Sequence, residues 1–155
     1  MALEIERRFL IKNENWKEFV TKKISIEQGY LSKYLDDWIV RLRSSDNDYK
    51  IALKKHIESF TNFEFEFSIP QKDGETIMAN LSNTIRKERF FLEVEKKSWI
   101  IDCFKGTNYP LEIAEIELSK EEEDLNLPSF ISQEITGLTH YSNFSLSNKP
   151  FSEWE

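Results

Sequence analysis

The stretch Glu4-Ile5-Glu6-Arg7-Arg8-Phe9, close to the start of the chain, has the strongest implication for the fold. Residues i and i+2 of a β-strand project from the same face, so Glu4 and Glu6 lie side by side, roughly 7 Å apart, with Arg8 next in the row. Two like charges on one face repel each other unless a cation or water separates them. The stretch therefore predicts a strand whose charged face binds an ion.

Pairs of the form acid-x-acid and base-x-base recur along the chain. The further acidic pairs are Glu64 with Glu66 and Glu115 with Glu117, and the basic pairs are Arg41 with Arg43 and Lys87 with Arg89. For any single pair, a solvated sheet face is the simpler interpretation. Solvent faces, however, usually mix signs so that cross-strand neighbours attract. The series of segregated pairs therefore favours a shared polar interior.

These residue types favour a site for a metal ion and a polyphosphate. Mg²⁺ and Mn²⁺ prefer hard oxygen ligands, such as carboxylates and phosphate oxygens. Polyphosphate needs several Lys or Arg groups, and the Arg fork matches phosphate oxygens. Lys54, which shares a strand face with Lys50 and Ala52, adds to the basic set. Acids on one wall and bases on the facing wall would orient a metal-chelated triphosphate for phosphoryl transfer.

Composition limits the alternatives. The chain has 155 residues, which suits one domain over 1–155, and its 39% hydrophobic content suffices for a packed core. The net charge of −7 argues against general binding to nucleic acid or to an anionic membrane. The single cysteine, Cys103, fits a reducing compartment, and no apolar stretch approaches membrane-spanning length. We expect a cytoplasmic, soluble protein. With only four glycines and no Gly-rich phosphate loop, a P-loop is excluded.

Period-two patterning dominates the chain and predicts a mostly antiparallel α+β fold. The expected strands span 3–11, 26–34, 38–44, 49–55, 61–69, 85–96, 98–104, 111–118 and 130–135. A short helical or irregular connection is expected over 13–23. Helical segments are expected over 73–83, 119–125 and 143–146, of which the second begins with a capping-box pattern at Ser119 and Glu122. About eight antiparallel strands with a few flanking helices predict a barrel or a strongly curved sheet. If the sheet closes, the charged faces would line a polar interior, and the Phe-rich faces would pack outward against the helices.

The order of these motifs resembles the CYTH domain, also called the triphosphate tunnel metalloenzyme fold. The first stretch is similar to the family's ExExK signature. The matching segments in order are Gln28-Gly29-Tyr30-Leu31, Arg41-Leu42-Arg43, Leu53-Lys54, Glu64-Phe65-Glu66, Lys87-Glu88-Arg89-Phe90, Ile101-Asp102-Cys103-Phe104, Ala114-Glu115-Ile116-Glu117, and Gln133 to Asn143. The resemblance covers nearly the whole chain.

The resemblance implies an eight-stranded antiparallel tunnel that hydrolyses or cyclises triphosphates with a divalent metal, Mg²⁺ or Mn²⁺. It implies metal ligands at Glu4, Glu6, Glu115 and Glu117, with Glu64 and Glu66 as secondary metal or water-orienting groups. It implies phosphate binding by Arg41, Arg43, Lys54, Lys87 and Arg89, with His140 near the substrate. Arg8, with Glu4 and Glu6, would be catalytic.

Three positions depart from the family pattern. Arg8 stands in place of the signature lysine, His140 in place of the basic residue before the C-terminal tyrosine, and Ile100 where an acid often precedes Asp102. His140 would carry full charge only at mildly acidic pH.

The sequence thus predicts a metal-dependent triphosphatase for inorganic tripolyphosphate or a related small triphosphate. One alternative is a thiamine triphosphatase or an adenylyl cyclase on the same fold. Another is a non-catalytic module that binds polyphosphate or a nucleotide. The preferred metal and the oligomeric state stay open.

Overall fold

The computed structural model describes residues 3–32 and 38–155. Within them, nine strands form one antiparallel sheet in the order β5-β4-β3-β2-β6-β7-β8-β1-β9, and β5 also pairs with β1. The strands are β1 (Leu3–Ile11), β2 (Val20–Tyr30), β3 (Ile39–Ser45), β4 (Asp48–Glu58), β5 (Thr61–Ile69), β6 (Thr84–Val94), β7 (Lys97–Phe104), β8 (Glu112–Glu117) and β9 (Ile131–Glu134). The helices are α1 (Gln71–Ala79) and α2 (Asn143–Asn148), with four short 3₁₀ turns, η1 (Asn15–Phe19), η2 (Gly106–Asn108), η3 (Thr139–Tyr141) and η4 (Phe151–Glu153).

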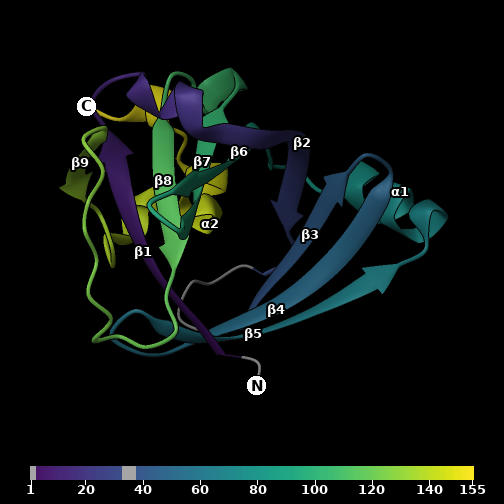
Figure 1. The fold of residues 1–155 in the computed structure, drawn as a ribbon. Coiled ribbons are helices and arrows are strands. Elements are labelled where there is room, and N and C mark those ends of the chain that lie inside the picture. Colours follow the sequence, from purple (N-terminus) through teal and green to yellow (C-terminus); the bar gives the residue numbers. More distant parts are fainter. Residues whose placement is uncertain (1–2, 33–37) are drawn as a thin grey trace.

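The pairing of β5 with β1 closes the sheet into an eight-stranded barrel, as the sequence predicted. Leu3 lies opposite Phe63, and Ile5 lies opposite Thr61. Further along, the same edge of β1 pairs with the short strand β9, where Ile11 lies opposite Ile131. One edge of β1 is therefore shared between β5 and β9. In Figure 1, β3 to β5 extend as a long curved arm from the body formed by β1 and β6 to β8, with α1 at the far end of that arm.

The main apolar cluster lies on the outer face of the body strands. Its fully buried members include Phe9, Trp99, Ile101, Ala114 and Ile116, and Trp16 and Phe130 cover them from η1 and the approach to β9. Because alternate residues of a strand project to opposite faces, burying these residues outward directs the charged residues between them into the barrel. The hydrophobic pattern of the body strands therefore sets the direction of the charged site.

Two boundaries near the start of the chain differ from those expected. The helical segment is only η1, and β2 begins at Val20, six residues before the expected start at Ile26. Val20 already lies opposite Leu92 of β6, so tertiary pairing extends the strand over a polar stretch that has no alternating pattern of its own. The expected continuation of this strand to Tyr34 lies outside the described residues.

The helix expected over 119–125 is wrong, because this segment forms turns and irregular structure. The Glu123 carboxylate accepts hydrogen bonds from the backbone N–H and the hydroxyl of Ser119, at 2.8 and 2.7 Å, and also contacts Lys97. These contacts give the Ser119 N–H and hydroxyl their hydrogen-bond partners without a helix. The acidic run contributes few apolar side chains that could hold a helix against the barrel.

The expected packing of the Phe-rich face of β5 under helices is also wrong. Phe63, Phe65 and Phe67 are 41%, 38% and 56% exposed. Helix α1 instead packs where the arm ends, over Tyr49. There Gly74 approaches the Tyr49 ring so closely that a Cβ would lie 2.2 Å from it. In the described part of the chain, no helix is both long and apolar enough to cross a membrane.

Candidate active site in the barrel interior

The strand register places the predicted charged residues on the inner face of the barrel. Glu6 lies opposite Glu117 and Arg8 opposite Glu115 across β1 and β8, and Lys54 lies opposite Glu64 across β4 and β5. Directly opposite residues of an antiparallel pair share a face. The charged residues of neighbouring strands therefore share one face of the sheet, as Glu4, Glu6 and Arg8 do within β1.

Ion pairs between strands that are not neighbours confirm this direction. Lys54 Nζ on β4 lies 2.8 Å from Glu4 Oε2 and 4.0 Å from Glu6 Oε1, both on β1, beyond the intervening β5. Arg41 Nη2 on β3 lies 3.2 Å from Glu66 Oε2 on β5, beyond β4. Contacts of this kind form only between side chains that project into the same interior.

The acidic part of the interior centres on Glu4, Glu6 and Glu64, around Lys54. Burial, reinforced by the charge of Glu6, raises the pKa of Glu4 to about 9. Burial also acts to raise the pKa of Glu6, but the charges of Lys54 and Arg8 outweigh it, and that pKa is lowered. Glu4 is therefore the group that holds a proton, because three carboxylates cannot all ionise at this spacing.

The basic part of the interior is organised by Asp102, which lies on β7. Its carboxylate accepts two hydrogen bonds from Arg89, at 2.8 and 2.9 Å, and lies 2.8 Å from Lys87 Nζ. Burial acts to raise the pKa of Asp102, but the charges of Arg89 and Lys87 hold it far below its usual range. Burial lowers the pKa of Lys87 to about 7, against the attraction of Asp102. Lys87 Nζ also donates to Asn143 Oδ1 at 3.0 Å, which connects it to α2.

Arg8 links three parts of the chain. Its Nε donates to Glu115 Oε1 at 3.3 Å, and its Nη1 donates to the carbonyl oxygen of Tyr141 at 3.0 Å. Its Nη2 is buried without a hydrogen-bond partner in the described residues. The guanidinium thus joins β1 to β8 and to the C-terminal segment, and one of its nitrogens stays available to an anion.

Two of the departures from the family pattern have different surroundings. Ile100 lies opposite Glu115 in the register and places an apolar side chain on the inner face. His140 is exposed, and its ring centroid lies 4.6 Å from that of Tyr141 and 5.1 Å from that of Trp154. The contacts of His140 are therefore aromatic, and its role in binding substrate stays a prediction.

Sequence reasoning did not assign a role to three interior residues. Asp102, Asn143 and Gln28 each contact a predicted cation. Asp102 has a signal in the sequence, because it is the one ionisable residue in the apolar run from Trp99 to Phe104 apart from Cys103. Gln28 and Asn143 have no such signal, because an amide in a strand or turn is usually exposed.

A divalent metal fits the donor chemistry of the acidic part, although its side chains do not form a ready cage. In residues 3–32 and 38–155, no group of three or more His, Cys, Asp or Glu side chains is arranged to hold a metal ion. Lys54 occupies the centre of the carboxyl cluster instead. Glu4 Oε2 is buried, and its contact with Lys54 is too poorly directed to be a hydrogen bond. This buried oxygen, with two further carboxyl groups beside it, suits a hard cation whose binding would displace the proton of Glu4.

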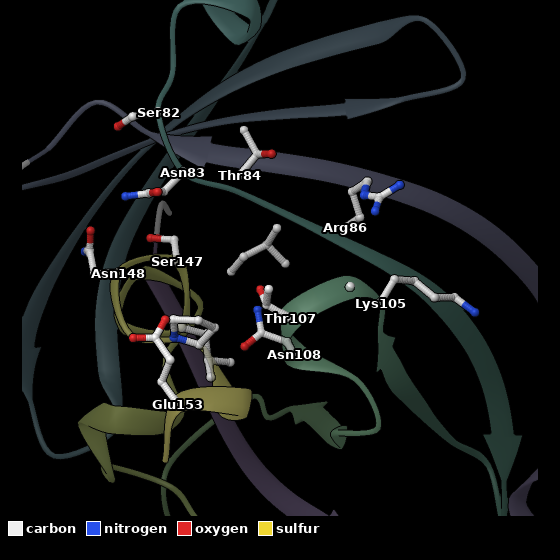
Figure 2. Close-up of a pocket in the computed structure, with 14 residues that line it drawn as sticks. Ser82, Asn83, Thr84, Arg86, Lys105, Thr107, Asn108, Ser147, Asn148 and Glu153 are labelled. Carbon is white, nitrogen blue, oxygen red and sulfur yellow. The ribbon is translucent and has the colours of Figure 1, made fainter.

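A separate cavity of about 480 Å³ lies between the start of β6, η2 and the C-terminal segment. Figure 2 shows Thr84, Thr107 and Ser147 around this hollow, with Glu153 beside it. None of its lining residues belongs to the predicted charged set. We therefore place the candidate site in the barrel interior and not in this cavity.

A closed antiparallel barrel with facing carboxylates and cations inside it is a charged tunnel for a polyanion. No protein-family model matches the chain. The chain is 30% identical to the inorganic triphosphatase of Acetivibrio thermocellus, over 100% of this chain and 99% of the relative. It is 26% identical to the inorganic triphosphatase of Nitrosomonas europaea, over 93% and 96%.

Solved structures agree with these relatives. The crystal structure of an inorganic triphosphatase, NE1496, superposes with a TM-score of 0.70 at 26% identity, over 95% of each chain. A putative adenylyl cyclase from Hippeastrum, 14% identical, shares the fold with a TM-score of 0.60 over 79% of this chain and 81% of the other. The protein belongs to the inorganic triphosphatases of the CYTH, or triphosphate tunnel metalloenzyme, family.

Proposed function

We propose that this protein hydrolyses inorganic tripolyphosphate, or a related small triphosphate, with the help of Mg²⁺ or Mn²⁺. The observation that carries the proposal is the facing arrangement of charges in the barrel, with Glu4, Glu6 and Glu64 on one side and Arg89 and Lys87 on the other. The names of the two relatives support the same substrate class.

The cations of the interior would bind the phosphate groups. They are Arg41, Arg43, Lys54, Lys87 and Arg89, with His140 as a further candidate near the C-terminal segment. Most of them already pair with carboxylates in the described residues, so the protein holds them in position before a ligand arrives. Phosphoryl transfer depends mainly on such positioning and on charge neutralisation.

The carboxylates would hold the metal. Glu4, Glu6, Glu115 and Glu117 form the proposed set, with Glu64 and Glu66 as secondary ligands or as groups that orient water. A bound divalent ion supplies charge neutralisation at the phosphate oxygens and lowers the pKa of water. Glu117 fits this role because burial and the nearby Glu6 and Glu64 raise its pKa, a repulsion that a cation would relieve.

Arg8 would stabilise the phosphoryl group during transfer. Its unpartnered Nη2 provides a donor, and its two bonds fix the guanidinium plane. Because Arg stays charged at all ordinary pH values, Arg8 would act as an electrostatic group and not as a base.

Phosphate release is the direct test. Tripolyphosphate, ATP and thiamine triphosphate should be compared with Mg²⁺, with Mn²⁺ and with EDTA. Fastest release from tripolyphosphate, lost in EDTA, is the expected result. A preference for thiamine triphosphate, or cyclic nucleotide formation from ATP, would assign another reaction to this fold. Binding without turnover on any triphosphate would make it a non-catalytic module.

The remaining expectations concern location and partners. A cytoplasmic location is supported by the single cysteine. A small triphosphate is the proposed partner, and the net charge of −7 argues against nucleic acid or an anionic membrane as a further one.

A further inference from the structure

Gln28 is a buried amide on β2, next to the strand β3 that carries Arg41 and Arg43. It lies on β2, is 0% exposed, and is opposite Arg43 of β3 in the register. A buried amide normally has hydrogen-bond partners, and Gln28 has one on each side. Its Oε1 accepts from Arg43 Nε at 3.1 Å, and its Nε2 donates to Tyr30 Oη at 2.8 Å. Because a guanidinium can only donate, the amide oxygen must face Arg43.

The charge balance of Arg43 differs from that of the other proposed phosphate ligands. Each other cation of the set with a described ion pair lies close to a carboxylate: Arg41 at 3.2 Å, and Lys54, Lys87 and Arg89 at 2.8 Å. Within residues 3–32 and 38–155, no carboxylate oxygen lies within 4.0 Å of Arg43. Its hydrogen bond goes to a neutral oxygen instead.

The surroundings of Arg43 are unfavourable to its charge in the absence of a ligand. Burial lowers the pKa of Arg43 to about 10, and the nearby charges of Arg41 and Arg89 act in the same direction, against a smaller opposing effect of Asp102. A bound polyanion would relieve both effects, since it replaces lost hydration and attracts all three guanidinium groups.

We propose that Gln28 is a positioning residue for phosphate binding, which holds the Arg43 guanidinium through a neutral acceptor and so leaves it available to pair with the triphosphate. The inference rests on the proposed function, because it assigns Arg43 to the substrate. A carboxylate at position 28 would fix the same nitrogen but would neutralise the charge. An apolar side chain would keep the charge but release the guanidinium.

The test compares two substitutions that separate orientation from charge. Gln28→Met removes the acceptor and should weaken tripolyphosphate binding about tenfold, the effect of one lost hydrogen bond to a charged group. Gln28→Glu keeps an acceptor and adds a negative charge, and should weaken binding at least as much. Binding is measured by calorimetry with tripolyphosphate at fixed Mg²⁺. KM should rise in both variants while kcat changes less. Ile26→Val, a small change at a buried position on the same strand face, is the matched control and should bind normally.

A double-mutant cycle separates a positioning role from a general structural one. In an Arg43→Ala background, Gln28→Met should change tripolyphosphate affinity by less than about twofold, because the group it positions is absent. Tyr30→Phe, which frees the other side of the amide, should give a smaller loss that is also absent in that background. If the melting temperature of Gln28→Met shows that it does not fold, Tyr30→Phe provides the same comparison.

The outcomes distinguish this inference from the proposed function. Undiminished binding by Gln28→Glu, or an equal effect of Gln28→Met with and without Arg43, would overturn the positioning role alone. Wild-type binding of tripolyphosphate without phosphate release would overturn the hydrolysis, while calorimetry would still decide the role of Gln28. Failure of the wild type to bind tripolyphosphate would overturn both.

Discussion

Lys54 Nζ on β4 lies 2.8 Å from Glu4 Oε2 on β1, although β5 separates these two strands in the sheet. Glu64 and Glu6 lie 3.7 and 4.0 Å from the same nitrogen. Without ligand, Lys54 therefore contacts two of the four proposed metal ligands, Glu4 and Glu6, together with the secondary one, Glu64. Because the neighbouring carboxylates surround it, the pKa of Lys54 is raised despite its burial. When a metal ion and a triphosphate bind together, the metal would contact Glu4 and the triphosphate would contact Lys54.

Ligand binding should stabilise the fold. Tripolyphosphate with Mg²⁺ should raise the melting temperature, because a ligand at 100 times its Kd adds about 2.7 kcal/mol to the free energy of unfolding. Differential scanning fluorimetry with and without the ligand measures this shift. Arg43→Ala should reduce it, while Lys120→Ala, at an exposed position, should leave it unchanged. No shift at saturating ligand would contradict a binding tunnel of any kind.

Substitution of the proposed metal ligands should abolish turnover. Glu4→Gln and Glu117→Gln each remove a carboxylate and with it both metal affinity and charge. Since the folded protein holds Glu4 protonated at neutral pH while the unfolded chain ionises it, Glu4→Gln removes the cost of that proton uptake and should leave the free energy of unfolding unchanged or higher. Phosphate release and urea unfolding measure the two effects separately. Glu93→Gln is the control, and residual turnover in Glu4→Gln near the wild-type rate would exclude Glu4 as a ligand.

Arg8 provides the riskiest prediction. Arg8→Ala should lower kcat tenfold or more, about 1.4 kcal/mol of barrier, because a cation is needed beside the transferring group. Arg8→Lys should retain or raise activity, since it restores the compact ammonium of the family signature. It should also lose the bond to the Tyr141 carbonyl, at about 1 kcal/mol of stability. Single-turnover kinetics at saturating substrate test this, and an Arg8→Ala enzyme as fast as wild type would contradict it.

Asp102 should be among the most sensitive positions for stability. Asp102→Asn leaves Lys87 and Arg89 buried beside a neutral amide, and should lower the free energy of unfolding by about 3–5 kcal/mol. Denaturant unfolding gives the value. Cys103→Ala, at the adjacent and half-buried position, is the control and should cost much less. Equal costs for the two variants would mean that Asp102 does not organise the cations.

The depressed pKa of Lys87 predicts how stability depends on pH. Its pKa is about 7 in the folded protein and 10.5 for an ordinary lysine, so between these values the unfolded chain binds more protons. The free energy of unfolding should therefore rise with pH between 7 and 10 because of this group, and should not depend on it below 7, where both states are protonated. Urea unfolding at a series of pH values measures the slope, which should be smaller in Lys87→Met. Identical slopes in the two proteins would contradict the depressed pKa.

The same group should make substrate binding depend on pH. A polyanion favours the protonated lysine, so tripolyphosphate affinity should fall as pH rises above 7, by at most about tenfold per pH unit. Calorimetry in buffers of different ionisation enthalpy should detect proton uptake on binding. Lys87→Arg, which stays charged, should remove the dependence; persistence of the dependence in that variant would assign it to another residue.

Much of the barrel could be predicted from local pattern. Alternation of charged and apolar residues determined the bounds of β1 and β5 and the face that each charge would occupy, because the period of a strand is fixed by its backbone. The series of like-sign pairs favoured a shared interior, since solvent-facing strands usually mix charges of opposite sign. These inferences needed no knowledge of which strands would meet.

Partner choice depended on tertiary structure. Nothing near Lys54 in the sequence indicates that it will meet Glu4, and nothing near Gln28 indicates Arg43, because closure of β5 onto β1 and pairing of β2 with β3 decide these contacts. The absence of the expected helix at 119–125 also depends on tertiary structure. Ser119 and Lys97 contact Glu123, and the segment has few apolar side chains that could pack a helix against the barrel. Sequence by itself determined the charges and their faces. The closed sheet decided which charge neutralises which, and which one stays free for a ligand, because electrostatic energies depend on separations across the barrel that no local pattern encodes.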